Sequence, residues 1–143
     1  MKQLLLIAVL CAGPLASCAA VPEQEPATQT GLTGRDWTLM DLDGQAVAPA
    51  SRPAHIRLEA DGRYSGSGGC NAISGAYTLD PGNRIHFSQG IHTMMACQTG
   101  MDTERGLAQA LNQADSYTVS GDTLTLETIG SGAVARFTAD TTP

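Results

Sequence analysis

The chain has 143 residues, a length that fits one domain, and its 14 acidic and 8 basic residues give a formal charge of -6. An acidic chain whose basic residues do not cluster is a poor candidate for binding nucleic acid, so we expect no nucleic-acid partner. Glycine is frequent, with 16 residues, while tryptophan and phenylalanine are scarce. This composition is typical of a sheet with many turns.

The N-terminal segment has the pattern of a secretory signal. Lys2 precedes the apolar residues 4–10, a run too short to span a bilayer, since a span takes about 20 apolar residues. Residues 15–18, with the sequence LASC, resemble a bacterial lipobox, in which the cysteine thiol receives a diacylglycerol before cleavage. We therefore expect residues 1–17 to be a lipoprotein signal peptide and Cys18 to become the lipidated first residue. The alternative is an ordinary cleaved signal in which Cys18 has no role.

The residues after Cys18 predict a tether. Residues 18–31 are rich in Pro, Ala, Gln and Thr and lack apolar periodicity, so we expect them to be flexible. Ala19 stands where an Asp would favour retention in the inner membrane, and the signal therefore resembles those of outer-membrane lipoproteins. We expect residues 32–140 to form the domain, anchored at the periplasmic face of the outer membrane, with the inner membrane as the alternative.

Alternating apolar residues and turn signals divide the domain into short strands. Ile56 and Leu58 share one face of a strand, and Ile85 and Phe87 share one face of another. Asp-Gly pairs such as residues 61–62 favour tight hairpin turns between strands. The expected strands are residues 37–42, 55–59, 63–66, 74–79, 84–88, 116–119, 123–127 and 133–137.

One helix is expected near residues 101–114. Leu107 and Leu111 form an apolar stripe on it, and Asp102 and Glu104 lie in its first turn, where they complement the positive end of the helix dipole. About seven antiparallel strands in meander order, interrupted by one helix, predict a mainly β (α+β) fold. We expect a strongly curved sheet or partial barrel, with the helix over its open end or concave face.

The domain keeps two cysteines. Cys11 lies in the signal and Cys18 takes the lipid, which leaves Cys70 and Cys97. In an oxidising compartment this pair favours a disulfide, and closing a loop of about 27 residues would stabilise the fold by roughly 3 kcal/mol. A catalytic thiol and a pair of metal ligands are the alternatives, although Cys-x-x-Cys spacing is absent.

Several strings together resemble the META domain family. They are the WTL strand at residues 37–39, GGCN at 68–71, SGAY at 74–77, TMMAC at 93–97 and DTLTL at 122–126. The resemblance covers residues 32–137 in order and spacing. It implies a secreted or lipid-anchored β-rich domain with no assigned biochemical activity, and an association with heat shock in bacterial members. It also implies a scaffold similar to that of the lipoprotein pilots of secretion systems.

The motif residues are interpreted as folding devices. Glycines within residues 66–69 indicate a bulge or sharp corner, and Asn71 can bond nearby backbone or adopt a left-handed conformation. We expect Met94 and Met95 to pack beneath the helix near the disulfide, with an adaptable binding surface as the alternative. The motif residues expected to be structural are Trp37, Gly69, Asn71, Gly75, Tyr77, Thr93, Met95 and Ala96.

No residue set points to catalysis, a cofactor or a metal, so we expect none. His55 and His86 each alternate with residues expected to be buried, so we expect both to face solvent. His92 is either a ligand or a loop residue that bonds backbone. Residues 65–69, with the sequence SGSGG, lack the Gly-x-Ser-x-Gly match of a nucleophile elbow and the lysine of a P-loop.

These features predict a non-enzymatic envelope lipoprotein that binds an envelope protein or an apolar ligand and contributes to envelope maintenance under stress. One alternative is an inhibitor of a periplasmic or host hydrolase such as lysozyme, with a protruding glycine-rich loop that enters the active-site cleft. Another is a chaperone resembling the secretion pilots. A third is an enzyme that uses a cysteine or a histidine.

Overall fold

The computed structural model describes residues 31–48, 50 and 52–140. The expected signal peptide at residues 1–17 and the lipidation site Cys18 lie outside the described residues. The elements are β1 Asp36–Leu42, β2 Gln45–Ala46, β3 His55–Leu58, β4 Arg63–Ser67, β5 Ala72–Asp80, β6 Arg84–Phe87, β7 Ile91–His92, α1 Met101–Gln113, β8 Ser116–Ser120, β9 Thr123–Thr128 and β10 Gly132–Ala139.

The strands form an antiparallel barrel that closes on itself. Neighbours follow the order β10-β9-β8-β6-β5-β4-β3-β1, and β1 also pairs with β10, so eight strands complete the ring. β2 adds to the edge of β1, and β7 adds to β5 beyond the end of β6. The expected curved sheet with one helix is confirmed, and its closure follows from the β1–β10 pairing between the two ends of the domain.

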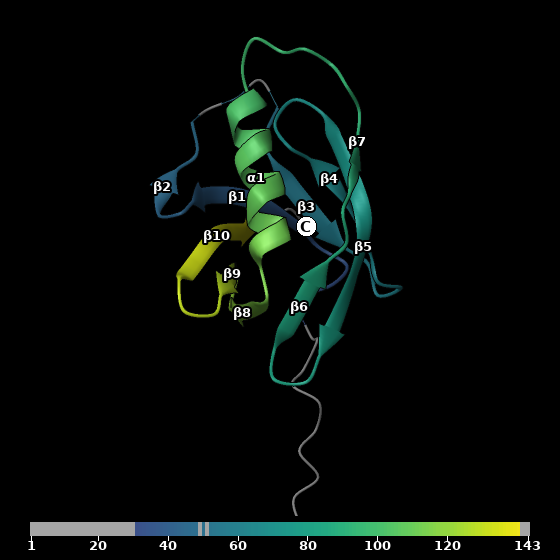
Figure 1. Cartoon of the computed structure of the whole chain (residues 1–143), viewed down its shortest axis with the longest axis vertical. Helices are drawn as coiled ribbons and strands as arrows, with labels where there is room; N and C mark the ends of the chain where they lie inside the picture. The colour runs from purple at the N-terminus through teal and green to yellow at the C-terminus, as the bar shows by residue number, and fades with distance from the viewer. Residues whose placement is uncertain (1–30, 49, 51, 141–143) are drawn as a thin grey trace, which may run out of the picture.

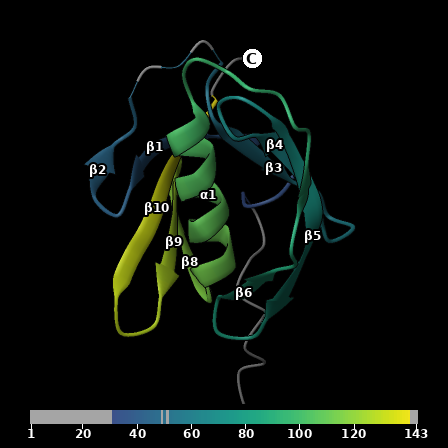
Figure 2. The ribbon, with the colours of Figure 1, turned by 45° about the horizontal axis from the view of Figure 1, so that its top comes forward.

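The ring has one weak seam, between β6 and β8. These strands meet at a single described pair, Arg84 and Ser116. Helix α1 lies at this opening, between the β8–β10 side and the β5–β6 side, as Figure 2 shows. Its apolar stripe, with Leu107, Ala110 and Leu111, is buried against the barrel interior. The helix therefore completes the core where the strands separate.

Alternation places the core as the sequence predicted. Ile56 and Leu58 on β3 and Ile85 on β6 are fully buried, and Leu124 and Phe137 close the core from β9 and β10. Burial at this level stabilises the fold by about 1.5 to 3 kcal/mol for each large apolar side chain. Two short strands, β2 and β7, were not predicted, because two-residue strands carry no readable alternation.

The two ends of the barrel differ. Near its described start the chain is tied to the end that carries the β3–β4 turn, because Gly34 donates a backbone hydrogen bond to Leu58 (2.8 Å). The β4–β5 connection, with Cys70 and Asn71, lies at the opposite end. Figure 1 shows the connection from β7 to α1 passing over that same end, away from the β5–β6 turn.

Candidate functional site

The segment of residues 91–97 runs beside β5 and carries the TMMAC motif. It is attached at four successive points. Ile91 pairs with Ser74, and the Thr93 amide donates to the Ala72 carbonyl (3.1 Å). The two further attachments are Met95 to Asn71 and Cys97 to Cys70. Fixing at four points in seven residues leaves this backbone with little freedom.

The side-chain amide of Asn71 takes the place of a peptide group. Its Oδ1 accepts from the Met95 amide (2.7 Å), and its Nδ2 donates to the Met95 carbonyl (3.2 Å). Its second acceptor site takes the Thr93 hydroxyl (2.9 Å), and its second N–H donates to Glu104 Oε1 (3.0 Å). Asn71 is 2% exposed, and these four bonds use the full capacity of its amide. The hydrogen-bond ladder between β5 and residues 91–97 therefore continues beyond Ala72, the first residue of β5.

Glu104 joins helix α1 to the same corner. Its Oε2 accepts from the Asn71 backbone amide (2.7 Å), so one carboxylate binds both the backbone and the side chain of that residue. A Cβ built on Gly68 would lie 2.5 Å from Glu104 Cγ, so only glycine permits this approach. The sequence indicated Glu104 only as a complement to the helix dipole. Its partner lies 33 residues away, a separation that no local pattern reveals.

The expected disulfide between Cys70 and Cys97 is present, with the Cα atoms 5.9 Å apart. Beside it, Gly69 (φ +106°) and Gly100 (φ +89°) adopt conformations that favour glycine. A Cβ on Gly100 would lie 2.6 Å from the Gly69 carbonyl oxygen. Residues 67–71 are buried by this packing. The glycine-rich stretch is thus a folded corner, and it does not form the protruding loop that was suggested for a hydrolase inhibitor.

The expectation for the two methionines was wrong. Met94 is 93% exposed and Met95 is 48% exposed, and neither packs beneath the helix. The first turn of α1 packs instead against the glycine corner, because Glu104 is held by Asn71 there. The contribution of Met95 to the fold is made by its backbone, which Asn71 holds, while its side chain stays outside. The methionines therefore form part of the surface.

The remaining motif residues divide between the barrel interior and the surface. Trp37 is fully buried and donates its indole N–H to the Leu32 carbonyl (2.8 Å). Tyr77 is buried and donates its hydroxyl to the Glu59 carbonyl (2.6 Å). A Cβ on Gly75 would lie 2.6 Å from a Tyr64 ring carbon. Ala96, on the segment of residues 91–97, is exposed.

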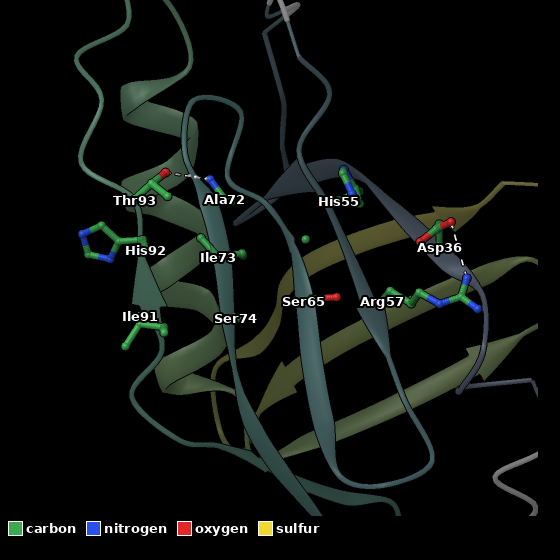
Figure 3. Close-up of a pocket in the computed structure, with 11 residues that line it drawn as sticks. Asp36, His55, Arg57, Ser65, Ala72, Ile73, Ser74, Ile91, His92 and Thr93 are labelled. Carbon is green, nitrogen blue, oxygen red and sulfur yellow. Dashed lines mark hydrogen bonds and ion pairs between the residues drawn. The ribbon is translucent and has the colours of Figure 1, made fainter.

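An open groove of about 540 Å³ lies on the outer face of the sheet beside this segment. We call it the outer-face groove. Pairing aligns a row of residues across it, and this row runs through Asp36, Arg57, Ser65, Ser74 and Ile91. Figure 3 shows the row on β1, β3, β4, β5 and β7, with Ile91 and His92 at one border.

The charges in the outer-face groove are paired. Arg57 donates to Glu59 (2.7 Å) and lies 3.5 Å from the Asp36 carboxylate. The hydrogen bond to Glu59 raises the pKa of Arg57, and attraction to the two carboxylates adds to this. His55 and His92 line the same groove, and His86 is exposed elsewhere on β6. The groove therefore offers hydroxyl and imidazole groups next to an ion pair that is already satisfied.

Residues 31–48, 50 and 52–140 contain no cluster of metal-ligating side chains and no long apolar helix. No group of three or more His, Cys, Asp or Glu residues lies close enough there to hold a metal ion. Within the same residues every buried side-chain nitrogen and oxygen has a hydrogen-bond partner. No helix among them is both long and apolar enough to cross a membrane.

Comparisons with known proteins agree with this architecture. The family model described as the META domain matches residues 30–141. A protein from Burkholderia xenovorans, solved by NMR, is 26% identical with a TM-score of 0.65, over 93% of this chain and 100% of that one. A DUF4847 family protein from Bacteroides vulgatus is 18% identical with a TM-score of 0.56, over 80% of this chain and 99% of that one, a likeness of fold alone. A comparison with curated protein sequences gives no match. Because the family model matches residues 30–141, most of the chain, the chain belongs to the META domain family.

Proposed function

We propose that this protein is a lipid-anchored, non-enzymatic protein of the cell envelope that recognises another envelope protein through the segment of residues 91–97. The observation that carries the proposal is Met94. Its side chain is 93% exposed, yet its neighbours Thr93 and Met95 are both held by Asn71. An apolar side chain presented to water on a fixed backbone is costly for an isolated domain and useful for binding.

The energetics favour a binding surface. Covering a large apolar side chain contributes about 1.5 to 3 kcal/mol. The backbone of the segment is already ordered by Asn71 and the disulfide, so binding does not have to meet that entropic cost again. Ile91, 75% exposed, and Met95, 48% exposed, are two further exposed apolar side chains of the same segment. Methionine side chains adapt readily to a partner's shape.

The anchor determines which partners are within reach. Cys18 with its lipid, followed by the tether of residues 18–31, would hold the domain at the periplasmic face of the outer membrane. The described chain begins near the β3–β4 turn, and the segment of residues 91–97 lies towards the opposite end. This arrangement directs residues 91–97 away from the anchored end of the domain. It therefore favours a protein partner in the periplasm over contact with the lipid surface.

The anchor is tested by metabolic labelling with palmitate and by membrane fractionation. The native chain is expected to take up palmitate and to fractionate with the outer membrane. Cys18→Ala is expected to lose the label and to leave the membrane fraction. Label retained in Cys18→Ala would contradict lipidation at this residue.

Recognition is tested by crosslinking in intact cells followed by purification of the anchored protein. Met94→Gln is expected to lose a specific crosslinked partner, while Met40→Gln is expected to keep it. Met40 is the matched control, because it is 52% exposed on β1 and receives the same change. A partner that survives Met94→Gln, or one that is lost equally in both variants, would contradict a binding role for the segment.

A further inference from the structure

The backbone of residues 91–95 forms an edge strand that extends beyond the two residues of β7. Thr93 donates to Ala72, which makes residue 93 a hydrogen-bonded position of the antiparallel ladder. The backbone N–H and C=O groups of Ile91, which pairs with Ser74, also point towards β5. Those of Met95 point towards the Asn71 side chain. Successive residues alternate in a strand, so the backbone N–H and C=O groups of His92 and Met94 point away from β5.

One of these two residues, His92, lines a second, smaller groove. It lies between β7 and helix α1, has a volume of about 140 Å³, and we call it the edge groove. Its lining residues are Tyr64, Ile73, Gln89, Gly90, Ile91, His92, Ala108, Leu111 and Asn112. This volume is well below the roughly 300 to 1,000 Å³ typical of small-molecule sites, so it suits one short aliphatic side chain.

The edge groove carries no formal charge when its histidine is neutral, although the chain as a whole has a charge of -6. A charged side chain entering it would lose water without gaining an opposite charge. Its buried walls include Tyr64 and Leu111, which favour an apolar occupant. Adding a strand to a sheet edge takes two features: backbone N–H and C=O groups without a partner, and an apolar surface that receives alternate side chains.

We propose that the edge groove binds an extended, uncharged segment of a partner protein, which adds as a strand to residues 91–95. The partner's backbone exchanges hydrogen bonds with His92 and Met94, and every second side chain of the segment faces Tyr64 and Leu111. This inference rests on the proposed function, because it specifies how the same segment recognises its partner. The partner's strand then continues the sheet beyond β7, on the side of β5 where β6 and β8 pair only at Arg84 and Ser116.

The first experiment uses the folded domain with its disulfide intact and a peptide library as probe. The library has the form acetyl-Thr-X-Thr-X-Thr-X-Thr-amide, with X as Ala, Val, Leu or Ile, and amide resonances are followed by NMR at millimolar peptide. We expect binding to shift the amides of residues 90–94 and to slow hydrogen exchange at His92 and Met94. The same library with X as Glu or Lys is expected to leave them unchanged. No shift with any uncharged member, or shifts confined to the outer-face groove, would overturn the proposal.

A backbone variant isolates the hydrogen bond. His92→Pro removes an N–H that points away from β5, and proline is tolerated at such edge positions. We expect it to keep the thermal midpoint but weaken peptide binding about fivefold to tenfold, as losing one hydrogen bond implies. His92→Ala keeps the N–H and is expected to bind as the native protein does. Equal binding by the proline and alanine variants would exclude strand addition.

A substitution on helix α1 tests the edge groove while residues 91–95 stay unchanged. Ala108 is exposed on α1 and lines the edge groove, and Gln109 is exposed on the same helix outside it. Ala108→Glu is expected to weaken binding of the uncharged peptides, while Gln109→Glu is not. If both variants bind equally, the peptide lies elsewhere.

The Met94 and His92 variants separate strand addition from the binding role of residues 91–97. A crosslinked partner that depends on Met94 but is unaffected by His92→Pro would leave the binding role intact and exclude strand addition. Self-association through the same edge would appear as a peptide-sensitive dimer in sedimentation. That result would assign the edge to a second copy of this chain and overturn the partner assignment.

Discussion

Asn71 and Met95 are joined by two hydrogen bonds of opposite direction, between the side-chain amide of one and the backbone of the other. The same amide also bonds Thr93 and Glu104, so one buried group connects the β4–β5 corner, the exposed segment of residues 91–97 and helix α1. The exposed surface and the folded corner therefore depend on one residue.

Replacing Asn71 by Asp keeps the shape and removes two donors. The new carboxylate would face the Met95 carbonyl and the Glu104 carboxylate, which leaves buried acceptors unpaired and sets two like charges together. We expect Asn71→Asp to lower the free energy of unfolding by about 3 kcal/mol, measured by urea denaturation at neutral pH. Thr93→Val, which removes one hydroxyl, is expected to cost about 1 kcal/mol. An Asn71→Asp variant no less stable than Thr93→Val would show that the network is unimportant.

The disulfide and the Asn71 network hold the same segment at two different residues, Cys97 and Met95. Reduction of Cys70–Cys97 opens a loop of 27 residues and is expected to lower the free energy of unfolding by about 3 kcal/mol. Because Asn71 still binds Met95, we expect the reduced domain to remain folded and to keep slow amide exchange at Met95. Alkylation without reductant is expected to label neither cysteine. Labelling of either one in the untreated domain would indicate an open bond.

Gly68→Ala tests the contact between the corner and the helix. The added Cβ would lie 2.5 Å from Glu104 Cγ and 3.1 Å from its Cα, so the helix has to shift. We expect a loss of about 1 to 3 kcal/mol, as overpacking typically costs, seen as a lower thermal midpoint. The double variant Gly68→Ala with Glu104→Ala removes the 2.5 Å contact with Cγ and keeps the 2.8 Å contact with Cβ, so its effect is expected to be somewhat smaller than the sum of the single effects. Simple additivity would mean that the two residues do not meet.

The tyrosines predict a loss of stability at alkaline pH. Burial raises the pKa values of Tyr64, Tyr77 and Tyr117, which are all three tyrosines of the chain. Above pH of about 10 the unfolded chain releases these protons and the folded chain retains them. The stabilisation is therefore complete below that pH and is lost as the pH rises through the folded values. Tyrosinate absorbance is expected to appear at higher pH in the folded domain than in the urea-unfolded chain, and coincident curves would contradict this.

The sequence by itself determined the eight strands of the ring, the helix and the family. Alternation at residues 55–59 and 84–88 and the stripe of Leu107 and Leu111 depend only on neighbours in the chain, so they predict which faces are buried. The cysteine pair followed from the number and placement of the cysteines alone, and the structure contains it.

Only the tertiary structure decided how the ring closes and what the motif does. The β1–β10 pairing and the Asn71–Glu104 contact join residues far apart in the chain, and no local periodicity encodes such pairs. The burial of Met94 and Met95 was predicted wrongly for the same reason. Two apolar side chains favour a core in a sequence-based prediction, but Asn71 and Ala72 hold the backbone of this segment along the edge of β5, where both methionine side chains stay exposed.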